Sequence, residues 1–170
     1  MNHEELIKLI ETAYWVKQTD IKYEVDKEKQ RQMADAQQRN VLAGGMKDGI
    51  EHRAMATLVE RSAIAYCGLI AEYYIKYGIE FDKDDVKKHK QFVDGIITPI
   101  SEIESQSVAK VKDKINQLFK LTCDDTNHTI DKNRSIYRKD KLWALVPTII
   151  GFLLGIISKP LSNYLLANLK

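Results

Sequence analysis

The sequence predicts an all-α protein, a cytosolic bundle of about four helices followed by a C-terminal transmembrane helix. Only three prolines occur in 170 residues, and no segment alternates apolar and polar residues over the length of a strand. Apolar residues instead recur at three- and four-residue steps, as on one face of a helix. The charges are also unevenly distributed, because residues 142–170 contain no acid and only two lysines. The pattern therefore indicates a charged helical body with an apolar tail.

The charge distribution predicts three parts of the chain. We expect a helical body at 1–121, a polar and basic connector at 122–141, and the apolar tail at 142–170. The first 141 residues hold 24 basic and 24 acidic groups, since two of the 26 basic residues lie in the tail. This composition excludes a collagen-like, disulfide-rich or low-complexity disordered chain. We expect both cysteines to be reduced thiols, with Cys67 buried and Cys123 half-exposed.

The first two helices are expected on either side of a glycine-rich break at residues 43–45. The first carries apolar residues on one face as far as Ile21, and from Lys22 to Asn40 it continues as a polar, solvated helix. The face residues are Leu6, Ile10, Ala13, Tyr14 and Ile21. The second runs from about Ile50 to Tyr77 as a central core helix. Gly78 is well placed to cap its end.

Two further helices complete the predicted body. Asp82 is the expected N-cap of the third, which Pro99 ends or kinks. Ser101 and Glu104 have the spacing of a capping box and open the fourth. The apolar stripe of the fourth helix comprises Ile103, Val108, Val111, Ile115, Leu118 and Phe119. Residues 122–135 are ambiguous between loop and helix.

The tail contains 17 residues without a charge, Leu142–Ser158. A helix of that length reaches about 25 Å, slightly less than the hydrocarbon core of a bilayer. Trp143 and Tyr164, the predicted interfacial aromatic residues, are about 31 Å apart along a helix. Lys159 is expected to extend its ammonium group to the interface.

Basic residues precede the tail, and small residues lie within it. Arg138, Lys139 and Lys141 are expected at the cytoplasmic membrane surface, because positive flanks remain on that side. Gly151 and Gly155 form a GxxxG pattern, where two helices can approach backbone to backbone. A single-pass membrane protein with its body in the cytosol is the resulting expectation.

Two alternatives remain open for the tail. Pro147 and the Lys159-Pro160 pair interrupt the apolar run, and a helix confined to 147–158 is too short to cross a bilayer. The tail then forms short helices in the core of a soluble bundle, or it lies in the membrane interface.

No catalytic, cofactor-binding or metal site is predicted. Gly44-Gly45 lacks the spacing of a phosphate-binding loop. The polar stretch Asp124–Asn133 lacks the central glycine and distal glutamate of a calcium loop. Glu51-His52-Arg53 fits an exposed cluster better than an acid–base site. The balanced charge of the body gives no support to nucleic-acid binding.

The functional hypothesis is a non-enzymatic, membrane-anchored protein that acts by self-association and by binding a cytosolic protein partner. The lipid bilayer is its second predicted partner. A first alternative is a membrane-perturbing effector, holin-like or of the anti-phage type, whose tail helices oligomerise when the body receives a signal. A second is a soluble helical binding protein whose tail is part of its core.

Overall fold

The structure is a computed structural model that describes the backbone of residues 1–101, 103 and 106–168. It also describes the side chains of these residues, apart from 106–107, 142–144, 146 and 148–168. The described backbone contains α-helices and one short 3-10 helix but no strand, which confirms the all-α prediction. The chain divides into two compact units, Met1–Ile130 and Asp131–Lys170.

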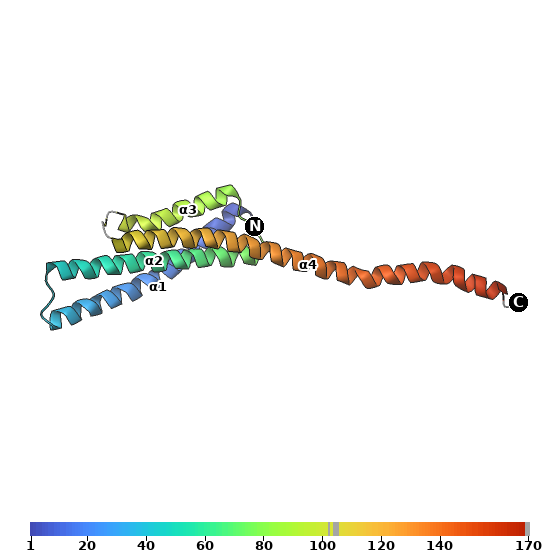
Figure 1. The fold of residues 1–170 in the computed structure, drawn as a ribbon, viewed down its shortest axis with the longest axis horizontal. Coiled ribbons are helices and arrows are strands. Elements are labelled where there is room, and N and C mark those ends of the chain that lie inside the picture. Colours follow the sequence, from blue (N-terminus) through green and yellow to red (C-terminus); the bar gives the residue numbers. More distant parts are fainter. Residues whose placement is uncertain (102, 104–105, 169–170) are drawn as a thin grey trace. The chain divides into compact units, whose positions relative to one another are not determined.

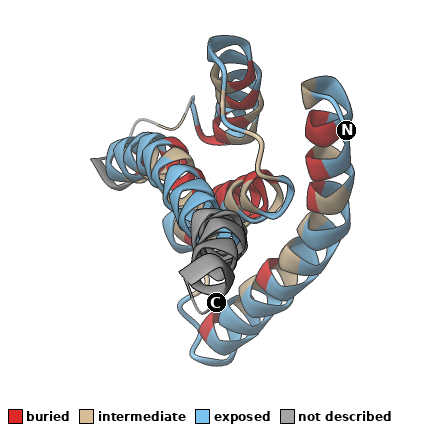
Figure 2. Ribbon diagram, turned by 90° about the vertical axis from the view of Figure 1, so that its right-hand side faces the viewer, coloured by how far each residue is buried: buried red, intermediate tan, exposed pale blue. Residues whose placement is uncertain are grey.

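Five elements follow one another along the chain (Figure 1). They are α1 (His3–Gln38), α2 (Gly44–Tyr77), α3 (Lys83–Ile97), the 3-10 helix η1 (Thr98–Ile100) and α4 (Gln106–Asn168). In the first unit, α1, α2, α3 and the beginning of α4 lie side by side. Their buried residues face the interior of this bundle (Figure 2).

Helix α1 begins with a capping box that the sequence analysis did not predict. Asn2 Oδ1 accepts from the Glu5 amide at 2.8 Å, and the Glu5 carboxylate accepts from the Asn2 amide at 3.0 Å. Leu6, Ile10 and Tyr14 are buried on the expected face. Beyond Lys22 the helix is mostly exposed, with Val25 and Ala36 as its buried positions. The predicted solvated continuation is therefore confirmed.

The connection from α1 to α2 is shorter than predicted. Asn40 adopts a left-handed conformation with φ of 55°, which asparagine tolerates better than most residues. Helix α2 begins at Gly44, six residues before the expected Ile50. The glycines of this segment therefore lie in the first turns of the helix, so the expected break comes before them.

Helix α2 is the central helix of the bundle. It buries Val59, Ala63, Tyr66, Ile70 and Tyr74. It ends at Gly78, whose φ of 62° is the left-handed conformation that a C-cap requires and that glycine adopts without strain. Both the core position and the cap were predicted correctly.

Helix α3 also begins and ends as predicted. The Asp82 side chain accepts from the Asp85 amide at 2.7 Å, and Asp85 accepts in return from the Asp82 amide at 3.4 Å. Pro99 lies in η1, directly after the helix. The predicted capping box at Ser101 and Glu104 falls partly on residues outside the described part of the chain.

The first part of α4 closes the core of the first unit. Val108, Ile115 and Phe119 are buried, as the apolar stripe predicted. The ambiguous stretch 122–135 is helical, and it buries Thr126 and Ile130. The boundary between the units therefore lies nine residues beyond the end of the predicted body, at Ile130.

The second unit begins with an exposed segment, 131–141. Arg138, Lys139 and Lys141 are all exposed, and Lys141 Nζ lies 5.2 Å from the centre of the Tyr137 ring. The backbone assigned to α4 stays helical at Pro147 and Pro160 and ends at Asn168.

A membrane-spanning helix at the C-terminus is not shown. Within the described residues, only α2 is long and apolar enough to cross a membrane, and several of its large side chains are buried in the bundle. The predicted span at 142–158 falls mostly on residues whose side chains lie outside the description. The same is true of Trp143, Gly151, Gly155, Lys159 and Tyr164.

Candidate functional site

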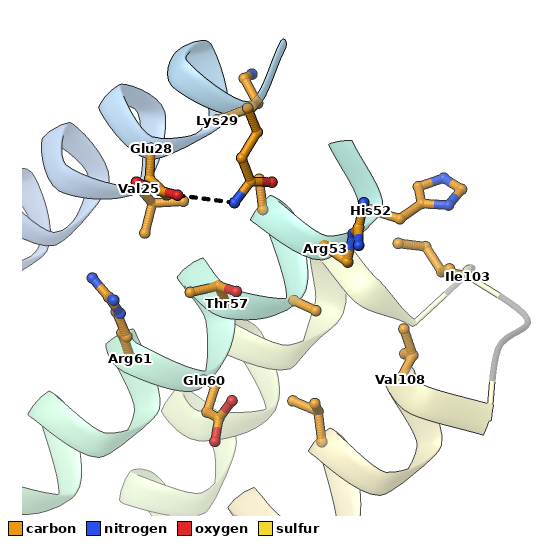
Figure 3. A pocket seen from close by; sticks show the side chains of 14 residues that line it. Val25, Glu28, Lys29, His52, Arg53, Thr57, Glu60, Arg61, Ile103 and Val108 are labelled. Carbon is orange, nitrogen blue, oxygen red and sulfur yellow. Dashed lines mark hydrogen bonds between the residues drawn. The ribbon is translucent and has the colours of Figure 1, made fainter. Parts of the chain in front are cut away.

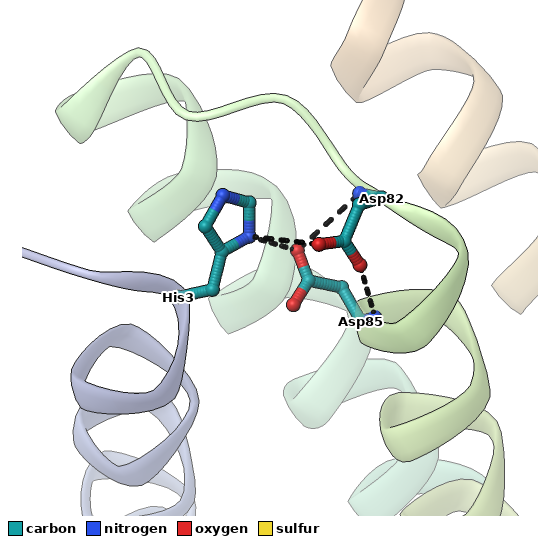
Figure 4. A group of neighbouring side chains, drawn as sticks. All are labelled: His3, Asp82 and Asp85. Atoms are coloured by element: carbon teal, nitrogen blue, oxygen red, sulfur yellow. Dashed lines mark hydrogen bonds and ion pairs between the residues drawn. The ribbon is translucent and has the colours of Figure 1, made fainter.

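A histidine and two aspartates meet where the beginnings of α1 and α3 come together (Figure 4). His3 Nδ1 hydrogen-bonds to Asp85 Oδ2 and lies 3.8 Å from Asp82 Oδ2. The Asp85 side chain is buried, whereas His3 and Asp82 are partly exposed. His3 and Asp85 are 82 residues apart in sequence, so no local pattern pointed to this cluster.

The cluster has the donor set of a small cation site. One ligand atom from each of His3, Asp82 and Asp85 lies within 4.8 Å of the others. Imidazole and carboxylate groups suit zinc or manganese. Each aspartate also caps α3, and the backbone hydrogen bonds to Asp82 lower the pKa of its carboxyl group. These contacts account for the cluster structurally without a metal.

A chain of buried polar side chains leads from this cluster into the core. Tyr66 Oη lies 2.8 Å from His89 Nδ1, and Tyr74 Oη lies 3.1 Å from His89 Nε2. The Tyr74 hydroxyl also lies close to the Asp85 carboxylate, whose negative charge contributes to the raised pKa of this phenol. We call the four buried residues of this chain, Tyr66, His89, Tyr74 and Asp85, the buried relay.

The partners assign the hydrogen-bond directions of the buried relay. The nearby Asp85 carboxylate favours a Tyr74 hydroxyl whose proton points toward it, so that the Tyr74 oxygen accepts from His89 Nε2–H. His89 Nδ1 then accepts from the hydroxyl of Tyr66. This tautomer satisfies both ring nitrogens of His89, as a buried imidazole requires. Every donor between Tyr66 and Asp85 therefore points toward the carboxylate.

Burial shifts the pKa values of the titratable side chains in the buried relay. Desolvation lowers the pKa of His89 from 6.5 to about 4, although the nearby Asp85 carboxylate opposes the shift. Desolvation also raises the pKa of Tyr66 and of Tyr74 well above 10, and the negative charge of Asp85 adds to the effect at Tyr74. At neutral pH the relay therefore contains a neutral imidazole and two protonated phenols.

The two cysteines lie in the same core. Both thiols are free and buried, so the expectation of a half-exposed Cys123 was wrong, because α4 continues past it in the core. Desolvation raises the pKa of Cys67 to about 11 and that of Cys123 to about 12. Thiols that remain protonated are poor nucleophiles and poor metal ligands.

A cavity of about 390 Å³ lies between α1, α2 and the beginning of α4 (Figure 3). Its charged side chains are largely paired within the protein. Arg61 lies 3.4 Å from Glu24, Glu60 pairs with Lys114, and Arg53 donates to the Gly49 carbonyl at 3.1 Å. The cavity is lined by both positive and negative side chains, and most of them already interact with other groups of the protein. It therefore presents no cluster of like charge that would bind a charged ligand.

The residues weighed for chemistry in the sequence do not assemble into a site. Glu51, His52 and Arg53 are exposed, in line with the surface interpretation. In the polar stretch 124–133, Asn127 Oδ1 accepts from the Phe81 amide at 3.0 Å, which ties α4 to the loop before α3. In the described part of the chain, the only group with metal-ligand spacing is His3, Asp82 and Asp85.

A second cavity, of about 420 Å³, opens between α1, α2 and α3, and its walls carry no charged side chain. Sequence reasoning missed this cavity as well as the buried relay.

Comparison with protein family models, curated proteins and solved structures finds no match to this chain.

Proposed function

We propose that this protein is a non-enzymatic, membrane-anchored helical module that acts through protein–protein contacts and self-association. The anchor in this proposal is the charge-free segment Leu142–Ser158 with its flanks. The observation that carries the proposal is the course of α4, which remains helical through Pro147 and Pro160 as far as Asn168.

The helical course of α4 answers the main objection to a membrane span. A helix confined to 147–158 would be too short, since about 20 residues are needed to cross the hydrocarbon core. With the backbone helical at both prolines, the distance from Trp143 to Tyr164 is about 31 Å. Prolines are tolerated in membrane helices more readily than in soluble ones.

The exposed segment before the tail supports one orientation of the chain across the proposed membrane. Residues 131–141 contain five basic and two acidic side chains. Arg138, Lys139 and Lys141 point to solvent and are available to anionic headgroups. Positive flanks usually stay on the cytoplasmic side, so the proposal has the first unit in the cytosol.

The first unit offers a surface for protein contacts along α1. Leu9, Val16 and Tyr23 are exposed to 37, 67 and 70%. They are spaced by seven residues and therefore lie along one side of the helix. Large exposed side chains aligned in this way support the proposed protein–protein role.

Membrane flotation of the full-length protein tests the anchor. Ile149→Lys with Leu153→Lys should move the protein from the floating membrane fraction to the soluble fraction after carbonate treatment. Each lysine costs about 3 kcal/mol at the centre of a bilayer, so the pair outweighs a marginal span. The matched control, Leu121→Lys with Ile136→Lys, places the same charges at exposed positions and should float as the wild type does.

Two results would contradict the anchor. The first is a wild-type protein that is monodisperse in buffer without membranes or detergent. The second is a double-lysine variant that still floats with the membrane, since flotation separates inserted protein from aggregates.

Self-association through the tail has its own test. Replacing Gly151 and Gly155 together by leucine should reduce the signal of a membrane two-hybrid assay at least fivefold, because the bulkier side chains keep the two backbones apart. Ile150→Leu with Ile156→Leu keeps the segment apolar and should leave the signal unchanged. An unaltered signal in the glycine variant would remove these residues from the interface.

The small residues and prolines of the tail also favour a second function, that of a membrane-perturbing effector. Tail helices that pack closely can assemble around a pore. Depolarisation of the membrane on induced expression, lost when Gly151 and Gly155 are replaced by leucine, would favour this function over a passive anchor. An unchanged membrane potential would favour the anchor.

A further inference from the structure

We propose that the uncharged cleft between α1, α2 and α3 binds a small, neutral aromatic molecule. The cavity has a volume of about 420 Å³, within the range of small-ligand sites. Residues from all three helices line it together with Pro99 of η1. They include Tyr14, Trp15, Met55, Leu58, Phe92 and Ile96.

Aromatic rings form one wall of the cleft. The Tyr14 ring lies edge-on to Trp15, with ring centres 5.3 Å apart, and edge-on to Phe92 at 5.2 Å. Trp15 is nevertheless 56% exposed, and Met55 on the opposite helix is 41% exposed. A flat apolar ligand between them would remove both side chains from water and would add aromatic contacts.

The absence of charge in the walls selects a neutral ligand. None of the residues lining this cleft is Asp, Glu, Lys, Arg or His. The neighbouring cavity of about 390 Å³, in contrast, is lined by Glu28, Lys29, Arg53, Glu60 and Arg61. An ion that entered the uncharged cleft would lose its hydration without gaining a partner of opposite charge.

A few polar groups can still orient a ligand. Gln18 and Gln91 contribute amide groups to the cleft. Ser62 is buried in its wall, and its hydroxyl makes no hydrogen bond of normal geometry with the described residues, although Tyr14 lies near it. Mostly apolar walls with a few polar groups are typical of sites for small molecules.

Gly95 provides a way to close the cleft without disturbing the fold. It lines the cavity, and a Cβ atom added there would meet no atom within 4 Å. A Cβ atom at this position therefore displaces no neighbour, and the rest of a leucine side chain should narrow the cleft that Gly95 lines. Gly68 of α2 is equally unobstructed, is exposed and does not line the cleft, so it supplies the matched control.

The test is a titration of the full-length, ¹⁵N-labelled protein in nonionic detergent with 5-fluoroindole, a neutral aromatic probe. The protein contains two tryptophans, so Trp15 and Trp143 give two indole N–H resonances, which Trp15→Phe assigns. We expect a saturable shift of the Trp15 resonance. Gly95→Leu should weaken binding at least tenfold, whereas Gly68→Leu should leave it within twofold of the wild type.

Three results would overturn the proposal. One is a Trp15 resonance that does not move, and another is unchanged binding in Gly95→Leu with a native spectrum. The third is a Trp15 resonance that shifts on dilution without the probe, since a second copy of the chain would then cover the cleft. The result does not depend on the anchor, because all residues that line the cleft belong to the first unit. Detergent takes up the same amount of probe for every variant, so partitioning does not affect the comparison between variants.

Discussion

Replacing His89 by glutamine should remove a large part of the acid sensitivity of this protein. Desolvation lowers the pKa of His89 from 6.5 to about 4 in the folded state. Well above pH 6.5 His89 is unprotonated in both the folded and the unfolded chain, so its burial costs no stability there. Below that pH the unfolded chain takes up a proton that the buried ring rejects until about pH 4. The free energy of unfolding should therefore fall by about 3 kcal/mol across this interval.

Urea unfolding of the full-length protein, followed by circular dichroism at a series of pH values, measures this loss. Glutamine can accept from Tyr66 and donate to Tyr74, but it does not titrate, so His89→Gln should flatten the slope between pH 6.5 and 4. His52→Gln changes an exposed histidine and should leave the slope as it is. An equal slope in His89→Gln and the wild type would show that other groups cause the acid sensitivity.

Asp85→Ala should cost about 3 kcal/mol of folding stability, because it removes a buried hydrogen-bonded carboxylate together with part of a helix cap. Two hydrogen bonds end at this carboxylate, one from His3 and the capping bond from the Asp82 amide, and the buried Tyr74 hydroxyl lies close to it. Without the carboxylate, the buried hydroxyl of Tyr74 loses a nearby polar group, and the first turn of α3 loses half of its capping box.

Asp84 supplies the matched control for this variant. It lies one residue earlier in the first turn of α3 and is exposed, so Asp84→Ala should cost less than about 1 kcal/mol, through the helix dipole alone. Asp85→Asn keeps an oxygen acceptor near Tyr74 and at the cap of α3, so its cost should fall between those of the two alanine variants. If both alanine variants cost the same, Asp85 serves only as a capping residue, and the buried relay contributes nothing to stability.

The helices of the first unit could be predicted because their signals are local. Leu6, Ile10 and Tyr14 are spaced for one helical face, and they are buried. Asp82 and Gly78 cap helices because of the chemistry of a carboxylate and the freedom of a residue without Cβ. The prediction was less accurate where such signals were weak. Residues 122–135 are mostly polar, so their sequence showed no clear helical pattern. The segment is nevertheless helical, and Thr126 and Ile130 are buried in the core.

The candidate sites could not be predicted in the same way. His89 sits among charged residues in the sequence, and nothing near it indicates that its ring is buried between Tyr66 and Tyr74. The uncharged cleft combines Trp15, Met55 and Gly95 from three helices. None of these residues is marked as a site residue by its type or spacing within its own helix. The cleft forms only because the three helices pack against one another.

The amino-acid sequence by itself determined that the chain is helical, where most of its helices end, which faces are apolar, and that the charges stop near residue 141. These properties depend on residues within a few positions of one another. Only the tertiary structure decided that His3 reaches Asp85, that burial lowers the pKa of His89 to about 4, and that one cleft lacks charge. These depend on which helix faces which, because burial and hydrogen bonding are set by neighbours that lie far apart along the chain.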